Sequence, residues 1–166
     1  IIWENGIYKE QEIVRSISEK FELIEKYKIN WNKNLFGKNL TTFYGTNLPP
    51  KSEKEKHCGK GEFLVIIFYD NDPKYGYVKT SRGTERVNIN IFTCKEKFRN
   101  LTGGGHKIPS TNSPLETNHD LTLIFGQNLE DVIKKLPTNW KGDKNILKKD
   151  LVGWNEWKDL KQLFYV

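Results

Sequence analysis

The sequence is poor in the residues that build disulfide-rich or metal-centred domains. Of its 166 residues only two are cysteine, Cys58 and Cys94, and they do not form a C-x-x-C pair. A disulfide framework or a zinc ribbon needs more ligands at closer spacing. Reduced thiols fit a cytoplasmic protein, and we predict no metal site.

Long apolar runs and dense basic tracts are also missing. No stretch of about 18 apolar residues is present, so the sequence predicts no membrane span, and no signal peptide is visible. No run of five or six basic residues marks a nucleic-acid-binding tail. The chain starts at Ile1 without a methionine and ends on apolar residues at Val166, so we expect it to be part of a longer polypeptide.

Aromatic residues and positive charge are what the sequence does have. Hydrophobic residues make 36% of the chain and aromatic residues 13%, which is enough to build the core of one domain. The net charge of +6 attracts anions such as nucleotides, phosphosugars, nucleic acid or lipid headgroups. A solvated lysine-rich surface explains the same charge, and both interpretations stay open.

Hydrophobic periodicity predicts strands and helices over residues 1–136. We expect strands at 1–3, 21–31, 63–69 and 121–125, helices at 8–21, 34–44, 88–101 and 127–136, and loops at 45–61, 70–83 and 102–120. Residues 137–166 are expected to form a C-terminal extension, mostly helix or turn, that leads into a further region.

Several short motifs, taken in their order, resemble the nucleoside-diphosphate kinase family. They lie at residues 2–7, 12–14, 21–24, 28–29, 43–44, 61–63, 95–103 and 121–136. The resemblance covers roughly residues 1–136. It implies an α+β fold with one ferredoxin-like antiparallel sheet and helices on its faces, to which residues 137–166 are expected to add a C-terminal helical extension.

The family's chemistry does not transfer to this sequence. Trp3 stands where the resemblance places the family's phosphate-binding lysine, and Phe125 stands where it places the nucleophilic histidine. Neither side chain can do that work, so the resemblance implies that ping-pong phosphoryl transfer is lost. Arg99 is the family ligand position that still holds a suitable residue. The family's self-association makes a homo-oligomer a candidate assembly, although the long loops at 45–61 and 70–86 interrupt the pattern.

The segment from Lys95 to Asp120 is dense in residues that bind anions or move protons. Its three consecutive glycines permit positive φ angles and a close approach of backbone N–H groups to an anion. His106 and His119 are the candidate catalytic residues, because histidine acts as acid or base near neutral pH. The candidate ligand-binding residues are Arg99, Gly103, Gly104, Gly105, Lys107, Ser110, Thr111, Asn112, Glu116 and Asp120.

Plainer interpretations of these residues stay open. The three glycines lack the spacing of a P-loop and are also typical of a flexible turn. His106 also suits an exposed loop, Glu116 a surface carboxylate, and Asp120 a hydrogen bond within a turn. A nucleophilic pair of His57 and Cys58 is disfavoured, because both lie in a charged loop that the sequence predicts to be mobile.

Three functions fit the sequence, in this order. The first is a nucleotide- or phosphate-ester-binding domain with a rebuilt site, with phosphoryl or nucleotidyl transfer as its candidate chemistry. There, His106 or His119 would transfer protons while Arg99 and Lys107 hold the phosphate. The second is a basic domain that binds or cleaves RNA, and the third is a non-catalytic interaction module. The sequence names no cofactor and leaves open whether the protein is an enzyme.

Overall fold

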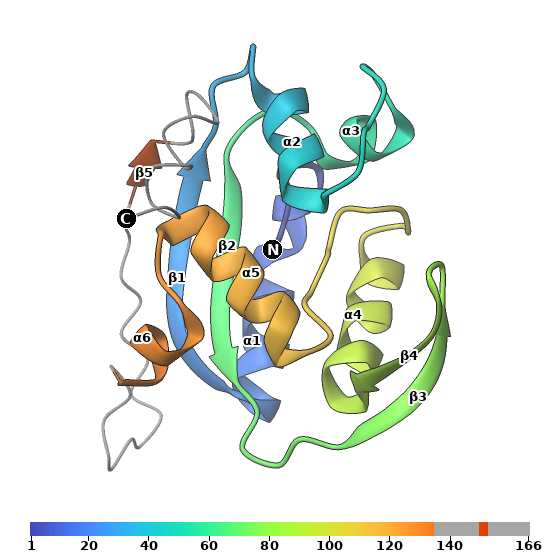
Figure 1. The fold of residues 1–166 in the computed structure, drawn as a ribbon, viewed down its shortest axis with the longest axis vertical. Coiled ribbons are helices and arrows are strands. Elements are labelled where there is room, and N and C mark those ends of the chain that lie inside the picture. Colours follow the sequence, from blue (N-terminus) through green and yellow to red (C-terminus); the bar gives the residue numbers. More distant parts are fainter. Residues whose placement is uncertain (135–149, 153–166) are drawn as a thin grey trace.

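The computed structural model describes residues 1–134 and 150–152, and it has an α+β fold with two separate sheets (Figure 1). The elements in chain order are η1 Glu4–Lys9, α1 Glu10–Lys20, β1 Glu22–Asn30, α2 Phe36–Tyr44, α3 Glu53–Cys58, β2 Phe63–Tyr69, β3 Tyr75–Thr80, β4 Gly83–Asn88, α4 Ile89–Leu101, α5 Pro114–Phe125, α6 Leu129–Lys134 and β5 Asp150–Val152. Within these ranges no helix combines the length and apolarity needed to cross a membrane.

The larger sheet has the order β2-β1-β5, with β1 and β2 antiparallel and the short β5 parallel to β1. The register of β1 against β2 shifts between Leu23 and Glu25. Such a bulge moves the side chains that follow to the other face of a sheet. Leu23 therefore packs on one side of the sheet, whereas Tyr27 and Ile29 pack on the other.

Each face of this sheet has its own hydrophobic core, because β2 is a continuous apolar strand. Leu64 of β2 packs with residues of α1 and α4, whereas Phe63 and Val65 pack with residues of α2 and with Trp3. Figure 1 shows α5 crossing in front of β1 and β2, with α1 behind them. The sheet is thus covered on both faces.

Six predicted elements are confirmed. The apolar run at 63–69 is β2, the alternating stretch at 21–31 contains β1, and the three periodic segments at 8–21, 34–44 and 88–101 contain α1, α2 and α4. The helix predicted at 127–136 contains α6. Most of the predicted C-terminal extension lies outside the described residues, apart from β5, which is a strand where helix or turn was expected.

For other segments the predicted type of secondary structure is wrong. Residues 121–125 are the last part of α5, not a strand, because Ser113 caps this helix through a bond from the Glu116 N–H, and Gly126 ends it with φ 63°. Residues 70–83 are not a loop throughout, since β3 and β4 form an antiparallel hairpin there. The predicted loop at 45–61 contains α3, and the predicted strand at 1–3 amounts to a single bridge between Ile2 and Leu64.

No four-stranded ferredoxin-like sheet is present among residues 1–134 and 150–152. The pairing of Phe125 with the kinase family's histidine assumed a final strand, and Phe125 instead ends a helix. What the structure shows of the expected fold is its coarser class, an α+β domain with small antiparallel sheets.

Candidate functional site

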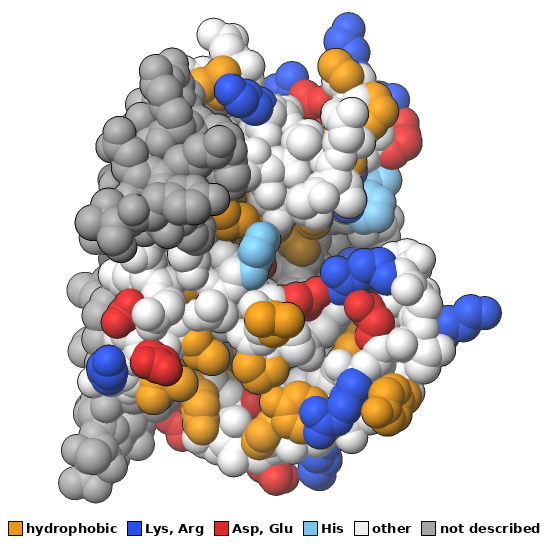
Figure 2. Space-filling view, viewed as in Figure 1, with side chains coloured by type: hydrophobic (Ala, Val, Ile, Leu, Met, Phe, Trp, Pro, Cys, Tyr) orange, Lys and Arg blue, Asp and Glu red, His pale blue; other side chains and the backbone are white. Residues whose placement is uncertain are grey.

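Four basic side chains from α3, α4 and the glycine-led segment are near enough for their charges to act on one another. Lys54 and His57 lie on α3, Arg99 lies in the last turn of α4, and His106 follows the glycines. We call these four residues the basic cluster. The rings of His57 and His106 are 5.4 Å apart between centroids and are tilted by 42°. Figure 2 shows this face of the molecule hollowed between its histidine side chains, with blue and red charged groups along the rim.

The electrostatics of the basic cluster favour an anion. Burial lowers the pKa of His106, and the positive charges of Lys54, His57 and Arg99 lower it further. Every charged group that shifts this pKa is therefore a cation. The Lys54 ammonium lies 3.8 Å from the centre of the Tyr44 ring, and burial lowers its pKa as well. A bound anion would relieve this crowding of like charges.

Two polar atoms of the basic cluster are buried and have no hydrogen-bond partner within the described part of the chain. They are Nε of Arg99 and Nδ1 of His57. The other end of the Arg99 guanidinium donates to Glu96 at 3.0 Å, and Nε2 of His57 lies 4.0 Å from the exposed Glu53. Buried polar groups normally find partners, so these two atoms are unsatisfied among the described residues of the free protein.

The three glycines bring His106 against α3. Gly103, Gly104 and Gly105 have φ angles of 76°, 81° and 79°, which side-chain-bearing residues rarely adopt. A Cβ atom on Gly105 would lie 2.9 Å from Nδ1 of His57, so only glycine fits against that ring. The N–H groups of Gly103 and Gly104 donate to carbonyls of Asn100 and Arg99. Two of the three glycine N–H groups that were expected to bind an anion are therefore occupied by the hydrogen bonds that end α4.

Lys107 and Ser110 lie deeper in the same segment. The Lys107 ammonium donates to the carbonyl of Thr102 at 2.6 Å, so it stabilises the end of α4. The hydroxyl of Ser110 is buried without a partner among the residues described. Neither residue shows a contact with the imidazole of His106.

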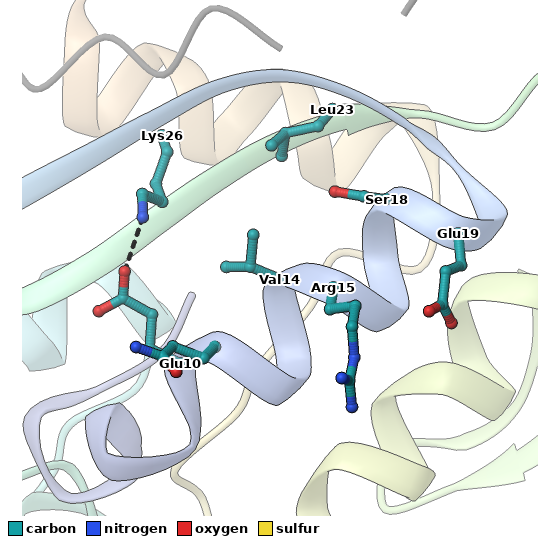
Figure 3. Close-up of a pocket in the computed structure, with 8 residues that line it drawn as sticks. Glu10, Val14, Arg15, Ser18, Glu19, Leu23 and Lys26 are labelled. Carbon is teal, nitrogen blue, oxygen red and sulfur yellow. Dashed lines mark hydrogen bonds and ion pairs between the residues drawn. The ribbon is translucent and has the colours of Figure 1, made fainter.

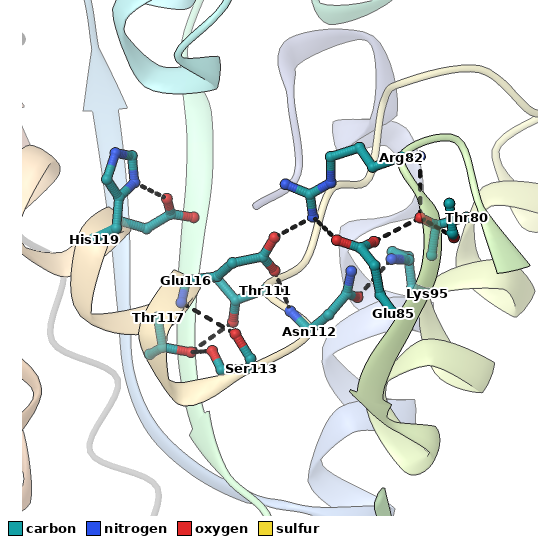
Figure 4. Close-up of polar contacts among 12 residues, drawn as sticks. Thr80, Arg82, Glu85, Lys95, Thr111, Asn112, Ser113, Glu116, Thr117 and His119 are labelled. Atoms are coloured by element: carbon teal, nitrogen blue, oxygen red, sulfur yellow. Dashed lines mark hydrogen bonds and ion pairs between the residues drawn. The ribbon is translucent and has the colours of Figure 1, made fainter. Parts of the chain in front are cut away.

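Thr111, Asn112 and Glu116 belong to a hydrogen-bond network, drawn in Figure 4. The buried Lys95 ammonium donates to the Asn112 side chain at 2.7 Å, and the Asn112 N–H donates to Glu116 at 2.6 Å. Glu116 also pairs with Arg82 at the tip of the β3–β4 hairpin. Thr111 shares a 2.7 Å hydrogen bond with Thr117. In this structure these residues fasten the segment between α4, α5 and the hairpin.

The Lys95–Asn112 bond gives a direct test of that network. Replacing Asn112 with alanine should lower the free energy of unfolding by about 2 kcal/mol, because it leaves a buried ammonium without its acceptor. Lys95→Met should recover most of this loss in the double variant, since no buried charge then remains. Urea unfolding of the two single variants and the double variant measures the coupling, and strictly additive losses would contradict the network.

The two candidate catalytic histidines lie in different surroundings. His119 is on α5, and its Nδ1 is 3.0 Å from Oδ1 of Asp120 (Figure 4). Burial raises the pKa of Asp120, and the hydrogen bond with His119 opposes that shift. The charges that act on His106 come from Lys54, His57 and Arg99 rather than from His119. The charge of Arg99 thus acts on His106, whereas His119 is not among the groups whose charges shift its pKa.

Sequence reasoning missed Lys54 as a site residue and placed His57 in a mobile loop. The missed signal was the helix start at Ser52, whose hydroxyl accepts from the Glu55 N–H and begins α3. Cys58, the other half of the nucleophilic pair considered above, has no exposed surface, and burial raises its pKa to about 12. Its thiol therefore stays protonated at neutral pH, which makes it a poor nucleophile.

Two hollows among the described residues lie away from the basic cluster. An open groove of about 500 Å³ runs between α1 and β1, and the ion pair of Glu10 with Lys26 crosses it at 2.6 Å (Figure 3). A void of about 30 Å³ within the α1–α4 core is too small for a ligand. Over residues 1–134, no three His, Cys, Asp or Glu side chains are arranged to hold a metal ion.

Comparison with known proteins gives no match for this chain. No family model matches it, and no curated protein or solved structure gives a significant match. The resemblance to nucleoside-diphosphate kinases therefore depends only on the motifs quoted for it, and the geometry of the site has to carry any functional argument.

Proposed function

We propose that the protein binds a nucleotide or another phosphate ester at the basic cluster. The observation that carries the proposal is the convergence of Lys54, His57, Arg99 and His106 from α3, α4 and the glycine-led segment. These cations depress the pKa of His106 in the free protein. A phosphate dianion placed among them would reverse that penalty, and the same charges would speed its encounter with the site.

Each member of the cluster has a chemical role in this proposal. The guanidinium of Arg99 suits the planar, bidentate recognition of two phosphate oxygens, and Lys54 supplies a point charge. The lowered pKa keeps His106 neutral near pH 7 in the free protein, and a bound phosphate raises it, so the imidazole can exchange a proton with the reacting groups. Phosphoryl or nucleotidyl transfer is therefore the reaction class that we propose for the site.

Thermal unfolding in the presence of phosphorylated ligands tests this proposal. The panel contains nucleoside di- and triphosphates, sugar nucleotides and pyrophosphate, with the matching unphosphorylated nucleosides as controls. A ligand at one hundred times its dissociation constant should raise the free energy of unfolding by about 2.7 kcal/mol. If no phosphorylated compound shifts the transition, the proposal is wrong.

A second candidate function is RNA cleavage, which the neighbouring imidazoles of His57 and His106 favour. Two histidines can divide the roles of general base and general acid without a metal ion. The protein should then cleave an RNA oligonucleotide in the presence of EDTA and leave the DNA of the same sequence intact. His57→Asn and His106→Asn should each abolish cleavage. If all activity is absent, the hypothesis of a non-catalytic interaction module is favoured.

A further inference from the structure

The β3–β4 hairpin presents an outward face that the basic cluster does not use. Tyr77 pairs with Arg86 and Lys79 with Thr84 in the hairpin register, so their side chains share one face with Tyr75. All five side chains are exposed. We call these five residues the outer face of the hairpin.

The opposite face of the hairpin is turned toward the protein. Val87 is fully buried, and a Cβ atom on Gly76 would lie 3.1 Å from the side chain of Ile89 on α4. The carboxylate of Glu85 also belongs to this inner side and pairs with Arg82 at 3.2 Å. The hairpin therefore packs on the protein through this inner face, and the side that carries the outer face is exposed except at Asn88, which pairs with Tyr75 and is buried.

The outer face combines aromatic rings with cations and contains no carboxylate. Tyr77 is 75% exposed and Tyr75 is 40% exposed. The guanidinium of Arg86 lies 4.4 Å from the centre of the Tyr75 ring. A single exposed tyrosine is unremarkable on a protein surface. Two on one strand face, flanked by Lys79 and Arg86, form the kind of surface that stacks bases and attracts phosphates.

The spacing of the two tyrosines favours an unstacked strand. Residues two apart along a β-strand are separated by about 6.7 Å. Stacked bases in a duplex rise by about 3.4 Å per nucleotide. Tyr75 and Tyr77 therefore stand about twice as far apart as stacked neighbours, which suits two bases that each lie on their own ring. A duplex, whose bases are paired and stacked, offers no such faces.

We propose that the outer face of the hairpin binds single-stranded nucleic acid. Bases stack on Tyr75 and Tyr77, while Lys79 and Arg86 contact the phosphates between them. This surface is separate from the basic cluster, and its binding does not depend on the function proposed there. RNA and DNA share the chemistry that the face recognises, and the two are compared directly in the experiment.

Fluorescence anisotropy of a labelled 12-nucleotide single strand, as RNA and as DNA, tests the proposal. Tyr77→Thr keeps a residue that favours strands and removes the ring, and it should weaken binding about tenfold, equal to about 1.4 kcal/mol. Tyr77→Phe should bind as the native protein does. Arg86→Gln should flatten the slope of log affinity against log salt by about 0.7, which corresponds to one phosphate contact.

Tyr8→Thr is the matched control, because Tyr8 is 67% exposed and lies on η1. It should leave binding unchanged, and the nucleotide-induced thermal shift should be unchanged in Tyr77→Thr. The proposal is overturned if Tyr77→Thr binds the single strand as the native protein does. It is also overturned if a duplex competes as well as the single strand. Equal, ring-dependent binding of heparin would assign the face to acidic polysaccharide instead.

Discussion

Replacing Trp3 with alanine is expected to lower the free energy of unfolding by about 3–5 kcal/mol. Trp3 has no exposed surface, and its indole N–H donates to the hydroxyl of Tyr44 at 3.2 Å. Its ring lies 4.5–6.0 Å, between centroids, from four aromatic neighbours, which are Trp31, Phe36, Phe43 and Phe63. Such a loss is a large part of the 5–15 kcal/mol that stabilises most domains. Urea unfolding measures it directly.

The Trp3→Lys variant distinguishes the role that the kinase resemblance gives to position 3 from the role that the structure gives to Trp3. If Trp3 merely occupied the place of a phosphate-binding lysine, this change would restore affinity for phosphate. The structure predicts the opposite, because the new ammonium would be buried among aromatic rings without a partner and the protein would unfold. Tyr8→Ala, a substitution at an exposed residue, is the control and should remain folded under the same conditions. A folded Trp3→Lys protein with tighter phosphate binding would contradict this account of Trp3.

The elements that the sequence predicts correctly are those whose hydrophobic pattern directly reflects which side chains are buried. Residues 63–69 read as a strand covered on both faces, and β2 has those bounds because its alternate side chains enter two different cores. The helices α1 and α4 are similarly marked by apolar residues at helical spacing. Such patterns are local consequences of packing, so they remain visible in the chain.

The two missed helices, α3 and α5, are marked by caps rather than by periodicity. Ser113 with Glu116, and Ser52 with Glu55, each follow the spacing of a helix N-terminus, and both serine hydroxyls accept the bond that this spacing predicts. In α5 the apolar run of residues 121–125 was interpreted as a strand because short apolar segments suit both structures. Ser113 and the proline that follows it resolve the ambiguity, because both are typical of the start of a helix.

The candidate site could be predicted only by residue type. Arg99 and His106 were selected because guanidinium and imidazole groups suit phosphate chemistry, and the structure places them in one cluster. Their partners Lys54 and His57 lie more than 40 residues earlier in the chain, on a helix that was taken for a loop. Contacts at that separation depend on the tertiary fold, and no local pattern reports them.

The double variant Lys54→Ala/Arg99→Gln is expected to lose affinity for the best phosphorylated ligand by about 100-fold or more. Each hydrogen bond to a charged group contributes about 1.5–3 kcal/mol, and the double variant removes two such donors. Arg15→Gln/Lys20→Ala is the matched control, because it also removes two positive charges and both residues are exposed on α1 outside the basic cluster. Isothermal titration calorimetry gives both affinities. Equal losses in the control and the double variant would mean that net charge, rather than the cluster, binds the ligand.

The pH dependence of binding should identify His106 within that site. Its pKa lies below the usual 6.5 in the free protein, because of burial and the charges of Lys54, His57 and Arg99. A bound dianion raises this pKa, so binding takes up a proton and affinity increases as the pH falls from the bound-state pKa toward the free-state pKa. Sulfate is the ligand to use, since its charge stays constant over this range. His106→Asn should flatten the profile while His119→Asn leaves it intact, and an equally steep profile in His106→Asn would show that the proton enters elsewhere.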